Sequence, residues 1–266
     1  MTMGMLERWT RWLAAAESGL RLSEEGCLWC GSTRARNGVA GGGGARAPGL
    51  CPDCAARVPW IDRVRCETCG RAEVCPDCPR RAVSYLVANR SAVAYSPFMK
   101  DLLARYKYRG SEKLSPLIGE MACYAYKQLS ALWPSKERCS LLTFVPLSER
   151  RLEERGFNQA EVMARFVGRR FRVPVAPLLV RTRHTEKQSY KSRRERLESL
   201  ERAFALRPDA EASLRRYAAG GPVRLVIVDD VYTTGSTLQH CAWTIAESEE
   251  DNALHSLRIY GLTWAR

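Results

Sequence analysis

The stretch that most constrains this chain is residues 223–238, VRLVIVDDVYTTGSTL. Within it, residues 225–229 are a short β-branched and aliphatic run bounded by turn signals, which predicts a buried strand of a parallel sheet. Asp229 and Asp230 stand at the carboxyl end of that strand, and an amphipathic segment that starts at Leu238 predicts a helix. This order of elements favours an α/β fold with a mostly parallel, twisted sheet flanked by helices.

Small residues fill the loop between the two carboxylates and the predicted helix: Thr233, Thr234, Gly235, Ser236 and Thr237. Such a loop directs backbone N–H groups and the positive end of the helix dipole toward one point, which suits a phosphate. The two carboxylates can accept hydrogen bonds from a vicinal diol. The alternative is an ordinary Ser/Thr helix cap, but a cap does not require two carboxylates after an apolar strand, where an unpaired charge is costly. The predicted ligand is a ribose that carries a 5′-phosphate.

Residues 228–237, VDDVYTTGST, closely resemble the phosphoribosyl pyrophosphate (PRPP) motif of type I phosphoribosyltransferases. In that family the acidic pair holds the ribose hydroxyls, the loop holds the 5′-phosphate, and Mg²⁺ accompanies PRPP. Family members that act on 6-oxopurines carry an aspartate three residues beyond the acidic pair, where this chain has Thr233. The resemblance therefore argues against hypoxanthine or guanine salvage. It leaves adenine, orotate, uracil, a non-base acceptor or no reaction.

Eight of the 11 cysteines form four C-x-x-C pairs. The pairs are Cys27/Cys30, Cys51/Cys54, Cys66/Cys69 and Cys75/Cys78. Such a pair can place two thiolates on one tetrahedral zinc ion. Because twenty residues separate the first two pairs, a zinc-ribbon spacing, we assign these pairs to one Zn²⁺ and the last two to a second, although interleaved pairing stays open. A tetrathiolate site has no open position for substrate, so both ions are expected to be structural.

The remaining cysteines, Cys123, Cys139 and Cys241, are interpreted as small buried hydrophobic side chains. Residues 34–48 contain four consecutive glycines, so they predict a flexible loop that is either a surface insertion or a contact for nucleic acid. Residues 1–20 have a helical apolar spacing but are interrupted by charges, so they predict neither a signal peptide nor a membrane span. A cytoplasmic location is therefore expected. The net charge of +13 favours polyanionic partners without choosing among them.

Residues 141–146 predict a second buried strand, which leads into a loop with Arg150, Arg151 and Arg155. In a parallel sheet this loop leaves the same edge as Asp229 and Asp230, where open α/β sheets bind ligands. Guanidinium groups grip pyrophosphate well, so we predict a role for Arg151 and Arg155 in stabilising a departing pyrophosphate. The alternative is a solvated basic turn.

Other segments give coarser predictions. Helices are expected over residues 97–108, 114–132 and 158–171, and strands at residues 83–87, 93–95 and 175–180, with one or two strands in residues 253–264. Residues 181–206 are too charged for a core and predict either a mobile cover over the site or a charged linker.

The order of these features is similar to the ComF (competence protein F) family. The features are the four cysteine pairs, residues 107–110 (KYRG), residues 155–160 (RGFNQA), the charged cover and the PRPP motif. This resemblance implies a double zinc ribbon before a type I phosphoribosyltransferase domain. It also implies a pyrophosphate loop over residues 145–155 that includes Leu147 and Ser148, and a hood over residues 181–204 with Gln188 and Arg196. Ser199 stands where the family usually carries Asn, which puts the hood chemistry in doubt.

We therefore divide the chain into an amphipathic N-terminal helix (residues 1–22), a double zinc ribbon (23–80) and a phosphoribosyltransferase-like domain (81–266). Two functions follow from the resemblance. In the first, the protein is a glycosyltransferase that uses PRPP and Mg²⁺ with an unidentified acceptor, in natural competence. In the second, it binds PRPP or a nucleotide without turnover and contacts single-stranded DNA and the helicase of the ComF operon.

Overall fold

The computed structural model describes residues 26–33, 46–107, 112–134, 137–182, 203–218, 223–247 and 257–266. Three predicted segments fall wholly or mostly outside these ranges: the N-terminal helix, the glycine-rich loop and the hood, with Gln188, Arg196 and Ser199.

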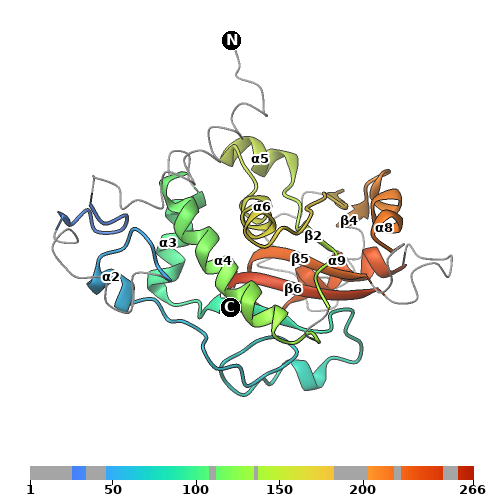
Figure 1. The fold of residues 1–266 in the computed structure, drawn as a ribbon, viewed down its shortest axis with the longest axis horizontal. Helices are drawn as coiled ribbons and strands as arrows, with labels where there is room; N and C mark the ends of the chain where they lie inside the picture. The colour runs from blue at the N-terminus through green and yellow to red at the C-terminus, as the bar shows by residue number, and fades with distance from the viewer. Residues whose placement is uncertain are drawn as a thin grey trace, which may run out of the picture.

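A four-stranded parallel sheet forms the centre of the molecule (Figure 1). Its strands, in spatial order, are β1 (Asn89–Val93), β6 (Arg258–Ala265), β5 (Arg224–Val231) and β2 (Leu141–Phe144). Every neighbouring pair is parallel, so all four carboxyl ends meet at one edge of the sheet. This arrangement confirms the predicted α/β class.

Helices cover both faces of the sheet. One face carries α3 (Pro97–Lys107), α4 (Ser115–Ser130) and α6 (Gln159–Phe171), which bury Val226 and Val228 of β5 in their shared core. The opposite face carries α8 (Ala210–Ala218) and α9 (Ser236–Glu247), which pack with Leu225 and Ile227. Because side chains alternate along a strand, Asp229 continues the α9 side and Asp230 continues the α3 side.

A second, two-stranded antiparallel sheet stands beside the first. It pairs β3 (Leu179–Arg181) with β4 (Phe204–Leu206) and packs against α9. The predicted strand at residues 175–180 is therefore shifted toward the C-terminus, and only Val175 bridges to Leu142 of the main sheet. In the described part of residues 253–264, where one or two strands were expected, the structure has the single strand β6.

Two other predictions need correction. Residues 83–87 do not form a strand, and Val83 and Val87 are 61% and 53% exposed. The edge strand is instead β1, whose polar Asn89 and Ser91 are buried because they share hydrogen bonds with Thr263 of β6. The arginine-rich segment after β2 is not an irregular loop but contains a short helix, α5 (Glu149–Arg155).

The cysteine-rich segment covers the outer edge of β1, and the helices within its described residues, α2 (Pro52–Ala56) and η2 (Cys78–Arg80), are short. Residues 59–61 run beside β1, where the Ile61 amide donates to the Ala92 carbonyl at 2.9 Å and the Ala94 amide donates to the Pro59 carbonyl at 2.9 Å. These bonds satisfy backbone groups that an open sheet edge would leave to solvent. The cysteine-rich segment is therefore packed against the sheet rather than tethered to it. A single 3₁₀ turn, η3 (Glu112–Leu114), precedes α4.

Candidate phosphoribosyl site and metal centres

The structure gathers the eight paired cysteines into two groups, each with sulfur atoms within 4.8 Å of one another. Cys27, Cys30, Cys51 and Cys54 form the first cluster. Cys66, Cys69, Cys75 and Cys78 form the second cluster. The sequential pairing is thus confirmed over the interleaved one. Cys123, Cys139 and Cys241 lie outside both clusters and are buried, as predicted.

The spacing of the sulfur atoms fits zinc. The Cys30 and Cys51 sulfurs are 3.7 Å apart, and those of Cys69 and Cys75 are 3.6 Å apart. Tetrahedral Zn–S bonds of about 2.3 Å place sulfurs about 3.8 Å apart, whereas a disulfide requires about 2 Å. Each cluster therefore has the ligand number, the ligand type and the spacing of a structural zinc site.

Backbone amides prepare both clusters for thiolate charge. Burial raises the pKa of Cys75, but amide donors, among them the Cys78 N–H at 3.4 Å from the Cys75 sulfur, lower it to about 6. Burial likewise raises the pKa of Cys27, and amides that include the Cys51 N–H at 3.3 Å lower it to about 7. Burial raises the pKa of Cys54 and Cys78 far above its usual range. Four thiolates in one cluster thus need a cation, which a bound zinc ion supplies.

The acidic pair, Asp229 and Asp230, lies at the carboxyl end of β5. Protein closely surrounds Asp229, and burial together with the charge of Asp230 raises its pKa to about 8. The Asp230 amide donates to the Asp229 carboxylate at 2.8 Å. Adjacent carboxylates at the ligand-binding edge of a parallel sheet are arranged for a polar ligand, since their mutual repulsion is otherwise unfavourable.

Cations reach the acidic pair from the α3 side. Lys107, the last residue of α3, forms an ion pair with Asp230 at 2.5 Å. Tyr95, just beyond β1, is close enough to Asp230 that burial and this carboxylate raise its phenol pKa. From the sequence, Lys107 was placed only within a predicted helix and the KYRG feature, so its contact with the acidic pair was missed.

Three guanidinium groups, Arg151, Arg155 and Arg181, form an arginine group around the acidic pair. Burial lowers the pKa of Arg155, the charge of Arg151 lowers it further, and the charge of Asp230 opposes the shift. Burial and Arg151 also lower the pKa of Arg181, on which the charge of Asp229 acts in the opposite direction. Arg155 thus lies within electrostatic reach of Asp230 and Arg181 within reach of Asp229, and the charge of Arg151 acts on both arginines. The role of Arg151 and Arg155 at a pyrophosphate stays a prediction.

The segment before α5 contributes a further polar group. Ser148 is the N-cap residue of α5, and within the described residues its buried hydroxyl has no hydrogen-bond partner. Leu147, directly before it, is half-buried. Asn158 caps α6 by accepting from the Ala160 amide at 3.0 Å and also donates to the Val145 carbonyl at 3.0 Å. Asn158 therefore ties the far end of this segment to β2.

The anion loop, residues 233–237, connects β5 to the N-terminus of α9. The Thr234 and Ser236 hydroxyls are 2.8 Å apart, and Thr233 and Thr234 are exposed. Gly235 has a φ of +79°, and a Cβ at this position would lie 2.2 Å from the ring of Tyr232. The loop therefore needs glycine here for both its backbone angle and its space.

Gly235→Ala should destabilise the protein by about 2 kcal/mol or more, because it combines a left-handed backbone with a collision. Gly31→Ala is the matched control, since Gly31 has a φ of +71° but no atom within 4 Å of its Cβ position. Urea unfolding of both variants measures the difference. Equal losses would show that Tyr232 moves aside without cost.

A cavity of about 370 Å³ begins directly beyond the acidic pair. At the sheet edge the cavity is lined by residues 231–233, Tyr95 and Arg266. On its other side it is lined by residues 71–73, which lie between Cys69 and Cys75. Its volume lies in the range of small-molecule sites. The loop between Cys69 and Cys75 of the second cluster thus forms part of the cavity wall, opposite the residues that follow the acidic pair.

Known proteins resemble this chain over most of its length. Competence protein ComFC of Bacillus subtilis is 31% identical over 79% of this chain and 83% of its own length. The chain belongs to the ComF family. ComFC of Streptococcus pneumoniae is 27% identical over 75% of this chain and 82% of its own length, and the DNA utilization protein YhgH of Escherichia coli is 29% identical over 73% and 89%. No family model matches the chain.

Among the helices of the described ranges, none combines the length and apolar character that a membrane span requires. The residues that sequence reasoning missed are Lys107, Arg181, Tyr95 and Arg81, which all come from segments outside the PRPP motif. The sequence offered one signal for two of them: Tyr95 follows β1 and Lys107 ends α3, and both elements lead to the ligand-binding edge.

Proposed function

We propose that this ComF family protein binds PRPP, with Mg²⁺ on the ligand, through the acidic pair, the anion loop and the arginine group. The observation that supports this most strongly is the acidic pair at the carboxyl edge of the sheet, directly before an anion loop at a helix N-terminus. A diol bound by carboxylates beside a bound phosphate is the chemistry of ribose 5-phosphate. The surrounding cations favour a ligand with several negative charges.

Each part of the ligand has a matching group. Thr233, Thr234, Ser236 and Thr237, with Gly235, offer hydroxyl and amide donors to the 5′-phosphate. Asp229 and Asp230 accept from the ribose hydroxyls, and Lys107 neutralises Asp230 when no sugar is present. Arg151 and Arg155, with the unpartnered Ser148 hydroxyl, offer donors to the pyrophosphate.

Turnover would require that pyrophosphate leave C1′ as an acceptor attacks. Negative charge then grows on the leaving group, and the arginine group with Mg²⁺ on the ligand stabilises it. The transition state at C1′ is oxocarbenium-like, so water must be excluded, a task that we assign to the hood with Gln188. Pyrophosphate release in the presence of trial acceptors distinguishes an enzyme from a binding protein.

Calorimetric titration with PRPP and Mg²⁺ tests the proposal. We expect the wild-type protein to bind and the double variant Asp229→Asn/Asp230→Asn to bind about 100-fold more weakly, because the carboxyl oxygens that accept from both ribose hydroxyls are altered. Asp101→Asn on the exposed face of α3 is the control and should bind normally. A folded, zinc-loaded wild-type protein that takes up no PRPP would contradict the proposal.

We also propose a role in DNA uptake or utilisation, in line with the names of the relatives. The net charge of +13 supports contact with a polyanion such as single-stranded DNA. If Lys and Arg contact phosphates directly, DNA affinity should fall steeply as salt rises, and a fluorescence titration at several salt concentrations measures the slope. Binding that does not respond to salt would instead favour a role through protein partners such as a helicase.

A further inference from the structure

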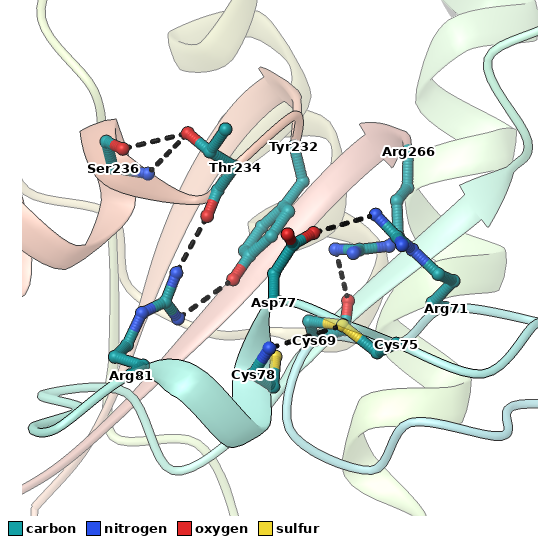
Figure 2. Close-up of polar contacts among 10 residues, drawn as sticks. All are labelled: Cys69, Arg71, Cys75, Asp77, Cys78, Arg81, Tyr232, Thr234, Ser236 and Arg266. Atoms are coloured by element: carbon teal, nitrogen blue, oxygen red, sulfur yellow. Dashed lines mark hydrogen bonds and ion pairs between the residues drawn. The ribbon is translucent and has the colours of Figure 1, made fainter. Parts of the chain in front are cut away.

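Hydrogen bonds made by the Arg81 side chain join the segment that follows the second cluster to the anion loop (Figure 2). Arg81 is three residues beyond Cys78, and its backbone N–H donates to the Cys78 carbonyl at 3.2 Å. Its guanidinium donates to the Thr234 carbonyl at 2.7 Å and to the Tyr232 hydroxyl at 3.4 Å. A side chain fixed by the cysteine-rich segment therefore contacts the backbone of the loop more than 150 residues later.

A second arginine makes a parallel link. Arg266, just after β6, stacks on the Tyr232 ring at 4.6 Å and donates to the Cys69 carbonyl at 3.1 Å (Figure 2). Tyr232 is only 3% exposed, and its ring fills the space beneath Gly235. The loop thus rests on a tyrosine whose position depends on two arginines, and each arginine is bonded to a carbonyl of a cluster cysteine.

The bond to the Thr234 carbonyl bears on anion binding because a trans peptide unit is rigid. Its C=O and N–H point in opposite directions, so the contact that fixes the Thr234 carbonyl also fixes the Gly235 N–H on the other side. Backbone N–H groups are the donors through which such a loop binds a phosphate. Arg81 therefore determines the direction of one of these donors without touching the ligand.

We propose that Arg81 is a positioning residue for the anion loop, and that a metal ion in the second cluster keeps Arg81 in place. Occupancy of the second cluster then sets the affinity of the protein for a phosphate-bearing sugar. The affinity part rests on the proposed function, whereas the mechanical link does not. The first cluster packs instead with α3, where Trp29 meets Phe98 at 4.7 Å, so its loss leaves the anion loop ordered.

Hydrogen exchange of the full-length, zinc-loaded protein without ligand tests the link. In Arg81→Ala, amides of residues 232–237 should exchange about tenfold faster than in wild type, because a charged hydrogen bond to the loop is lost. Arg81→Lys should restore part of the protection, since an ammonium can still donate to the Thr234 carbonyl. Arg80→Ala, at the exposed neighbour, is the control. Wild-type exchange in Arg81→Ala would overturn the proposal.

Removing one ligand from each cluster tests the role of the metal. Cys78→Ser should lose zinc from the second cluster and raise loop exchange as Arg81→Ala does, whereas Cys30→Ser should lose zinc from the first cluster without this effect. Zinc content is measured alongside exchange. If the loop responds equally to both variants, or to neither, the second cluster does not position Arg81.

Ligand affinities separate positioning from general damage. By calorimetry, Arg81→Ala should bind ribose 5-phosphate about tenfold more weakly and inorganic pyrophosphate as wild type does, because pyrophosphate contacts the arginine group. Equal weakening of both ligands would indicate a structural role and overturn the positioning claim. If wild type binds neither ligand, the proposed function fails, while the exchange experiment still decides the link between Arg81 and the loop.

Discussion

Removal of zinc is expected to cost this protein more stability than any single substitution in its sheet domain. The two clusters stand in a segment whose described residues form only the short helices α2 and η2, so we expect metal binding to supply much of the free energy that orders it. Structural zinc contributes on the order of 10 kcal/mol in small domains. Because Cys69 and Cys75 belong to the core shared with α9, the loss should extend into the sheet domain.

Metal analysis and urea unfolding of Cys69→Ser measure this effect. Zinc content should fall from close to two ions per chain to close to one, since two clusters are present. Cys123→Ala is the control, because Cys123 is also buried but lies in α4 outside both clusters. It should keep both ions and lose only about 1 kcal/mol. A wild-type content near one ion would show that one cluster is not a zinc site.

Local sequence patterns predicted the parts of this molecule whose geometry is local. Residues 225–228 are apolar because this part of β5 is buried on both faces, and position 235 is a glycine because other residues adopt its backbone angle only at a cost. The C-x-x-C pairs predicted the two clusters because two residues between the cysteines suffice to place both sulfur atoms on one ion. The pattern also gave the cap at Asn158, whose side chain accepts from the amide two residues later.

The remainder depends on contacts between distant segments. β1 was not predicted because its sequence contains the polar residues Asn89 and Ser91. Both are buried through hydrogen bonds with Thr263, which is 174 and 172 residues away, so no local pattern contains that partner. Lys107 and Arg81 look like ordinary basic residues at the ends of helical segments until the sheet brings Asp230 and Thr234 beside them. The sequence therefore predicts the ligand-binding loop better than it predicts the groups that surround it.

Asp229 should make the stability of the protein fall as pH rises. Asp229 has a folded-state pKa of about 8, against 3.8 for an ordinary aspartate. Between these values the folded protein binds more protons than the unfolded chain, so stability is lost as pH rises through that interval and is fully present below about pH 4. Asp229→Asn removes this loss, and at pH 9 it should be more stable than wild type by on the order of 6 kcal/mol.

Urea unfolding at pH 5, 7 and 9 measures the free energy of unfolding of Asp229→Asn and of wild type. The difference between the two removes the contribution of the other titrating groups. Asp101→Asn is the control and should follow the wild-type curve, because Asp101 is exposed on α3. Asp230→Asn should act on Asp229 indirectly, since the charge of Asp230 raises the Asp229 pKa. Removal of that charge lowers the Asp229 pKa, so less stability should be lost between pH 5 and 9 than in wild type. A constant difference between Asp229→Asn and wild type across this range would mean that Asp229 is already ionised in the folded protein. In that case Lys107 and Arg181, the two cations that lower its pKa, outweigh burial and the neighbouring charge.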